Sequence, residues 1–168
     1  MGARLALHVA LRHPSLVERL IVLGATGGID DDAERDTRRR ADNELADSIE
    51  RDGVPAFLDR WLAQPMFADV PDDREERLTN SAAGLASSLR LAGTGTQRPL
   101  WHAIRGLNMP VLVLAGANDP KFVAAGRRLA DCIGGNAHFA TIPSARHAAH
   151  LEQPLAFARI VHHFTRGA

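Results

Sequence analysis

The stretch that decides the fold is MPVLVLAGAND, at positions 109–119. Its first eight residues are apolar or glycine, and short runs of this kind are typical of a strand that is buried on both faces of a parallel sheet. The polar residues Asn118 and Asp119 follow after Ala117. Open parallel sheets place ligands and catalytic groups at the carboxyl ends of their strands. We therefore expect a buried strand over 109–116 whose carboxyl end presents Asp119.

Two further stretches have strand character. One is the apolar, branched run at 17–25, which glycine ends, and the other spans 137–142. Helical patterns cover 122–133 and 154–164, and the chain opens with a helical pattern that Pro14 interrupts. Parallel strands need crossover helices, so strand, helix, strand, helix in this order predicts an α/β fold with about three parallel strands and flanking helices.

The middle of the chain, from 30 to 105, has no strand signal. Its helical patterns span 30–51, 54–62, 71–77 and 83–91, and three aspartates at 30–32 stand where a helix dipole favours anions. This region has the character of an insertion into the sheet domain. We therefore predict two domains: an α/β core made of 1–29 and 106–168, and a helical cap over 30–105.

Composition excludes several classes of protein. Twenty Lys and Arg residues balance twenty Asp and Glu residues among 168, so no net charge attracts nucleic acid or an anionic membrane. Cys132 is the only cysteine, which excludes an internal disulfide and a cysteine-rich zinc site and fits a reducing compartment. No apolar run approaches the ~20 residues of a membrane span. We expect a cytoplasmic protein with no nucleic-acid or membrane partner.

Asp119 and His147 are the candidate catalytic residues. Each also has a simpler interpretation: Asp119 caps the following helix, and His147 is a loop histidine or forms a metal pair with His150. An acid after one strand and a histidine after the next is, however, the chain order of the α/β-hydrolase relay. In that relay the histidine acts as general base and acid, while the acid fixes its tautomer.

The segments around these two residues resemble the acid and histidine blocks of α/β-hydrolase-fold enzymes. The blocks are LVLAGAND at 112–119 and HAAHLEQP at 147–154. Met1-Gly2 resembles the end of the family's Gly-x-Ser-x-Gly elbow, with Gly2 as its last glycine. The resemblance implies a serine immediately before Met1, and the start of the chain would then lie beside the His147 imidazole. No serine of this chain lies in such a context.

Within that superfamily, essentially the whole chain resembles the 2-succinyl-6-hydroxy-2,4-cyclohexadiene-1-carboxylate (SHCHC) synthases of menaquinone biosynthesis. Arg4, Arg38 and Arg77 stand at the family's arginine positions, and WLAQPMFA at 61–68 resembles its Trp-x-x-Gln-Pro-x-Phe block. The resemblance implies that the three arginines and Trp61 bind the substrate. Other interpretations are a solvated arginine run at 38–40, an ordinary helical ion pair for Arg77, and core packing for Trp61.

The resemblance implies a carbon–oxygen lyase that eliminates pyruvate from a polycarboxylate by a Ser-His-Asp relay, without a metal or an organic cofactor. It also implies that this chain, lacking the serine, is inactive by itself. Two alternatives stay open: a carboxylesterase or C–C bond hydrolase, and an inactive fragment that serves in binding. Because three strands leave a sheet edge open, we also expect self-association through that edge.

Overall fold

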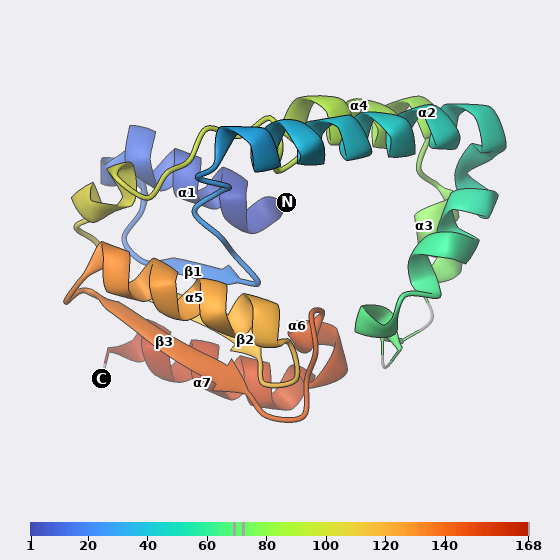
Figure 1. Ribbon diagram of the computed structural model, residues 1–168. Helices are drawn as coiled ribbons and strands as arrows, with labels where there is room; N and C mark the ends of the chain where they lie inside the picture. Colours follow the sequence, from blue (N-terminus) through green and yellow to red (C-terminus); the bar gives the residue numbers. More distant parts are fainter. Residues whose placement is uncertain (69, 72, 168) are drawn as a thin grey trace. The chain divides into compact units, whose positions relative to one another are not determined.

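The computed structural model describes residues 1–68, 70–71 and 73–167 (Figure 1). The chain divides into two compact units, each described here by itself. The sheet unit comprises Met1–Gly27 and the chain from Leu100 onward, and the helical unit comprises Gly28–Pro99. The sequence-based boundary at 106 therefore differs from the structure. Trp101 and Ile104 are buried in the core of the sheet unit, which is why residues 100–105 belong to it.

Three parallel strands form the sheet, in the order β1-β2-β3. They are β1 (Leu20–Leu23), β2 (Val111–Gly116) and β3 (Ala137–Ile142). Every residue of the central strand β2 is buried, as expected for a strand covered on both faces. The strand over 137–142 has the predicted bounds.

Strand β1 is shorter than the predicted run over 17–25. Its register runs from Leu20 opposite Val111 to Leu23 opposite Leu114. The Leu20 N–H donates to the Pro110 carbonyl at 2.9 Å, and proline has no N–H with which to continue the ladder. Pro110, which directly precedes β2, therefore limits the pairing at the N-terminal end of β1, although the apolar pattern begins earlier.

Helices cover both faces of the sheet (Figure 1). The helices of the sheet unit are α1 (Gly2–Arg12), α5 (Pro120–Ile133), α6 (Ala149–Glu152) and α7 (Pro154–Arg166), with 3₁₀ turns η1 (Pro14–Leu16) and η3 (Ala103–Gly106). On one face, Leu7 of α1 and Leu129 of α5 pack with Val22 and Val113 of the strands. On the other face, Ile142 packs against α7. The short helix α6 was not expected from the sequence.

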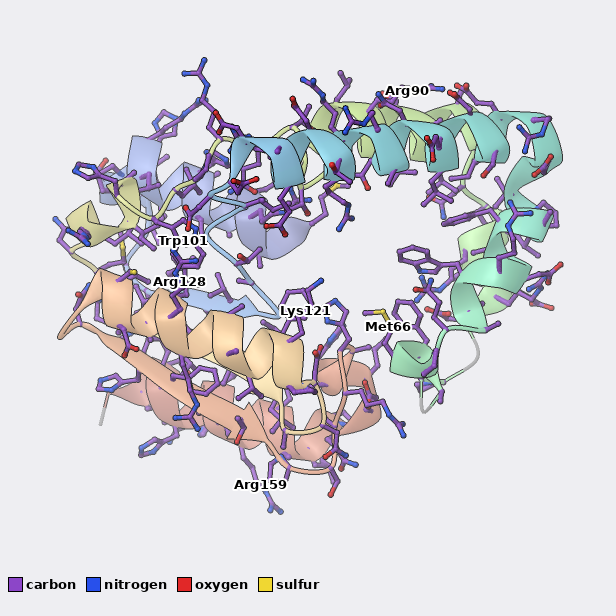
Figure 2. The ribbon with its side chains drawn as sticks, in the orientation of Figure 1. Met66, Arg90, Trp101, Lys121, Arg128 and Arg159 are labelled. Carbon is purple, nitrogen blue, oxygen red and sulfur yellow. The ribbon has the colours of Figure 1, made fainter. Side chains whose placement is uncertain are left out.

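A cation–π contact stabilises the segment at 100–105, where the chain returns to the sheet unit. The guanidinium carbon of Arg128, on α5, lies 3.8 Å from the centre of the Trp101 ring (Figure 2). A cation over an indole face stabilises by about 0.5–2 kcal/mol. Trp101 is thus held to the helix that covers the sheet.

The helical unit contains no strand among its described residues. Its elements are α2 (Asp32–Leu62), η2 (Pro65–Phe67), α3 (Arg74–Leu78) and α4 (Ala82–Ala92). Gly53 interrupts α2 with a non-helical backbone (φ 85°), which separates the two helical segments that the sequence predicts. Residue 72, which belongs to the predicted helix start at 71–73, lies outside the described residues.

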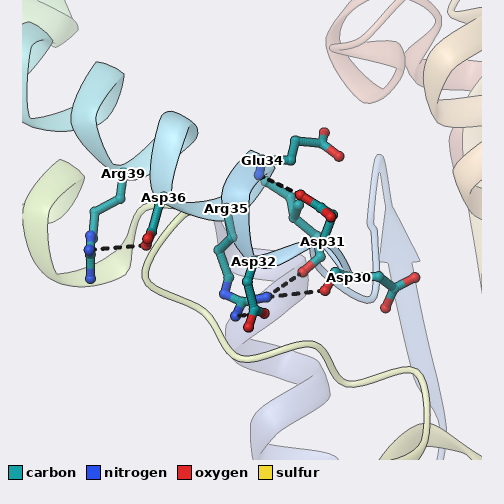
Figure 3. Close-up of polar contacts among 8 residues, drawn as sticks. Asp30, Asp31, Asp32, Glu34, Arg35, Asp36 and Arg39 are labelled. Atoms are coloured by element: carbon teal, nitrogen blue, oxygen red, sulfur yellow. Dashed lines mark hydrogen bonds and ion pairs between the residues drawn. The ribbon is translucent and has the colours of Figure 1, made fainter.

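Acidic residues stabilise the start of α2. The Asp31 carboxylate accepts a hydrogen bond from the Glu34 N–H at 2.7 Å, and Arg35 pairs with Asp32 (Figure 3). Asp31 is therefore the N-cap, and carboxylates here also interact favourably with the helix dipole. The predicted role of the aspartates at 30–32 agrees with this geometry.

Candidate active site

Asp119 performs two functions with its two oxygens. Its Oδ1 accepts a hydrogen bond from the Phe122 N–H at 3.2 Å, which caps α5. Its Oδ2 lies 3.0 Å from Nδ1 of His147. The two interpretations of this residue are therefore not exclusive, because the cap orients the carboxylate whose second oxygen meets the imidazole.

His147 lies in the loop that follows β3, next to the end of β2. Its side chain is 29% exposed and that of Asp119 is 13% exposed. The Phe122 ring packs against the imidazole with centroids 4.5 Å apart. The pair is thus shielded on one side and still reachable by solvent, as a group that exchanges protons with a bound molecule requires.

Gly24, which directly follows β1, lies close to the imidazole. Its φ is +60°, and a Cβ added there would lie 3.1 Å from Cε1 of His147. A left-handed backbone and a close ring both favour glycine at this position. The carboxyl ends of all three strands therefore contribute to the surroundings of His147.

The backbone of the histidine loop is held against the end of β2. The Asn118 N–H donates to the Ala145 carbonyl at 2.8 Å. A Cβ at Gly116 would lie 1.9 Å from the Arg146 carbonyl oxygen and 2.4 Å from that of Ala145. Only glycine permits this close approach, so the observed position of the His147 loop requires glycine at 116.

The geometry is suited to general acid–base chemistry. With its proton on Nδ1 and donated to Asp119, the imidazole keeps a lone pair on Nε2 that can accept a proton from a substrate or a nucleophile. The carboxylate then stabilises the imidazolium that forms. Among the described residues, no group of three or more His, Cys, Asp or Glu side chains is arranged to hold a metal ion.

The three candidate arginines lie in different units. Arg4 is half-buried in α1 of the sheet unit. Burial of the Met1 amino group lowers its pKa, and the positive charge of Arg4 lowers it further. Arg38 and Arg77 belong to the helical unit.

Arg38 and Arg77 each form an ion pair one helical turn away. Arg38 Nε donates to Oδ1 of the buried Asp42 at 2.8 Å, and Arg77 Nε donates to Asp73. The bond from Arg77 lowers the pKa of Asp73. Both bonds use Nε, so the outer Nη edge of each guanidinium takes no part in them. A carboxylate partner at Nε orients that outer edge for a second anion.

Trp61 belongs to an aromatic cluster of the helical unit. Its ring stacks on Phe57 with centroids 5.5 Å apart and contacts Phe67 at 5.6 Å. The side chain is half-buried. Core packing accounts for the contacts, and the exposed part of the ring remains available for a ligand.

Sequence patterns did not single out three contributors to the surroundings of His147. They are Gly24, Gly116 and Glu152, whose carboxylate contacts the histidine loop. A glycine at or near the end of a predicted strand was the available signal for the first two. Glu152 stands in the quoted histidine block, but its backbone partners have no signature in the sequence.

Comparison with known proteins agrees with this geometry. A family model described as "Alpha/beta hydrolase family" matches residues 1–160. The chain belongs to the alpha/beta hydrolase family. This confirms the predicted α/β-hydrolase fold, with its three-stranded parallel sheet and flanking helices.

Among curated members of this alpha/beta hydrolase family, the chain is similar to SHCHC synthases. It is 36% identical over 172 residues to the putative 2-succinyl-6-hydroxy-2,4-cyclohexadiene-1-carboxylate synthase of Bacillus subtilis (strain 168), covering 98% of this chain and 62% of the relative. It is 30% identical over 163 residues to that synthase of Enterobacter sp. (strain 638), covering 94% and 61%. The predicted resemblance to this family is confirmed, and the chain spans less than two thirds of the length of these relatives.

Two solved structures resemble the chain over nearly its whole length. MenH from S. aureus superposes with a TM-score of 0.92 at 28% identity, over 98% of this chain and 64% of that chain. A thermophilic esterase from Thermogutta terrifontis superposes with a TM-score of 0.77 at 20% identity, which shows a shared fold alone. Among the described residues, no helix combines the length and the apolar character needed to cross a membrane.

Proposed function

We propose that this chain provides the acid and the histidine of a Ser-His-Asp relay in a lyase similar to the SHCHC synthases. The observation that carries the proposal is the 3.0 Å contact between His147 Nδ1 and Asp119 Oδ2. The 36% identity to the Bacillus subtilis synthase supports the reaction class. In this proposal the nucleophilic serine belongs to a part of the protein outside these 168 residues. The protein acts in the cytoplasm.

The proposed reaction is an elimination. His147 takes the proton of the serine, and the serine oxygen removes a proton from the succinyl arm of the substrate. The carbon–oxygen bond to the pyruvate unit then breaks, and pyruvate leaves with the proton that the imidazole returns. The reaction needs no metal and no organic cofactor, because a carboxylate-oriented imidazole supplies the base.

Arginines bind the carboxylates of the substrate in this proposal. Arg4, Arg38 and Arg77 supply permanent charge and forked donors, which match carboxylates better than lysine does. Two hydrogen bonds support this role: Arg38 Nε donates to Asp42, and Arg77 Nε donates to Asp73. Each bond holds the guanidinium in place without using its two Nη groups. Trp61 forms part of the pocket wall.

The experiment compares this chain with a protein in which it is joined to the remaining part of the Bacillus subtilis relative. Pyruvate release from the synthase substrate is followed with lactate dehydrogenase, and hydrolysis of a p-nitrophenyl ester is measured in parallel. We expect pyruvate release from the joined protein and none from the chain alone. Release by the chain alone would refute the contribution of an outside serine.

The same assay separates the alternatives. Ester hydrolysis without pyruvate release by the joined protein would favour the carboxylesterase or C–C bond hydrolase. The absence of both activities in a folded joined protein would refute the lyase and favour an inactive fragment that serves in binding.

A further inference from the structure

Glu152, at the end of α6, is bonded to the backbone on both sides of His147. The Arg146 N–H donates to Oε2 of Glu152 at 2.6 Å, and the Ala148 N–H donates to Oε1 at 2.9 Å. These are the two residues that flank the histidine in the chain. One carboxylate therefore holds the peptide before His147 and the peptide after it.

We propose that Glu152 is a positioning residue for His147: its carboxylate fixes the loop so that the imidazole faces Asp119. The catalytic meaning of this role rests on the proposed function, whereas the geometry stands without it. Both bonds to the Glu152 carboxylate come from backbone N–H groups, so Glu152 acts on His147 through the backbone.

The loop needs such a holder because its backbone is strained and its helix is short. Ser144 adopts a φ of 56°, which is uncommon and unfavourable for a residue with a side chain. Helix α6 has four residues, too few to fix the loop by helical hydrogen bonds alone. The bond from Asn118 reaches only Ala145, before the histidine.

A carboxylate suits this task better than any other side chain. It offers two acceptor oxygens to two N–H donors, and hydrogen bonds to a charged acceptor are shorter and stronger than neutral ones. The Glu152 N–H also donates to the Ala148 carbonyl at 3.0 Å, so a backbone bond and a side-chain bond both join Glu152 to Ala148. A glutamine side chain at this position has only one acceptor oxygen, and its NH₂ group would face one of the two backbone N–H donors.

The test uses the 168-residue chain and nuclear magnetic resonance. Hydrogen exchange is measured at the amides of Arg146 and Ala148, together with the low-field resonance of the His147 Nδ1 proton. In Glu152→Gln we expect the two amides to exchange about 10-fold faster or more, because losing a charge-assisted bond costs about 1.5–3 kcal/mol. We also expect the Nδ1 proton signal to broaden or vanish. Glu18→Gln is the matched control, an exposed carboxylate of the same unit, and should change neither.

Each outcome decides the proposal. Unchanged exchange and an unchanged Nδ1 signal in Glu152→Gln would overturn it. Faster exchange with an intact Nδ1 signal would also overturn it, since Glu152 would then stabilise the loop without orienting the imidazole.

If Glu152→Gln fails to fold, the wild-type chain still tests the idea, because exchange at both amides as fast as in an exposed loop would refute it. Pyruvate release plays no part in these measurements. A failed lyase assay would therefore refute the proposed function alone.

Discussion

Replacing Gly116 by alanine tests how the end of β2 positions the histidine loop. The added Cβ would lie 1.9 Å from the Arg146 oxygen and 2.4 Å from the Ala145 oxygen, whereas Cβ atoms in proteins do not approach within 3.0 Å of other atoms. Both oxygens belong to the backbone, so no side chain can rotate away. Overpacking in a close-packed site costs about 1–3 kcal/mol, and a backbone clash on this scale belongs at the upper end.

A destabilisation of about 3 kcal/mol lowers Tm by about 6–12 °C in a chain of this length. Differential scanning calorimetry measures it, with Gly135→Ala as the matched control. A Cβ at Gly135 has no atom within 4 Å, so that variant should melt at or slightly above the wild-type temperature. If Gly116→Ala melts within about 2 °C of Gly135→Ala, the packing of the loop on β2 is wrong.

Three further predictions concern the arginines, one carboxylate and the sheet edge. The arginines proposed to bind substrate are Arg4, Arg38 and Arg77. In the joined protein, replacing any one of them by glutamine should raise KM for the synthase substrate about 10- to 100-fold, because each variant loses a charge-assisted hydrogen bond to the substrate. The control Arg159→Gln, on the exposed face of α7 (Figure 2), should leave KM unchanged. Unaltered KM in all three would contradict the polycarboxylate substrate. Because the bond from Arg77 lowers the pKa of Asp73, its stabilisation is present at neutral pH and is lost as the pH falls through that lowered pKa. Arg77→Gln should raise this pKa toward its usual value in carboxyl ¹³C titrations, and an unchanged value would show that the pair does not form in solution. Self-association should appear in light scattering as a mass that rises with concentration, since β1 has a free edge and Leu5 and Val9 of α1 are about half exposed on one helix face. A monodisperse monomer that melts cooperatively would contradict it.

Much of the sheet unit could be predicted because its signals are local. The apolar run before Asp119 is short and ends in glycine, which favours a strand buried on both faces, and the structure agrees to within two residues. The chain order of Asp119 and His147 follows from strand connectivity, so their proximity could also be inferred.

The remaining features depend on contacts between segments. The start of β1 is limited by Pro110, which directly precedes β2, and no pattern within 17–25 contains that limit. The membership of residues 100–105 depends on the burial of Trp101 in a distant core. The bond from Arg77 goes to Asp73, and the sequence alone indicates a helical ion pair without identifying the partner. A side chain that accepts hydrogen bonds from backbone N–H groups, as Glu152 does, has no sequence signature.

The most direct test of the account is the rate of pyruvate release by the joined protein and by its Asp119→Asn variant. Asparagine keeps the shape of the side chain and removes the charge that holds the imidazole tautomer. We predict that kcat falls about 10³- to 10⁴-fold while KM changes little. A variant that releases pyruvate at the wild-type rate would show that Asp119 and His147 do not form the catalytic relay.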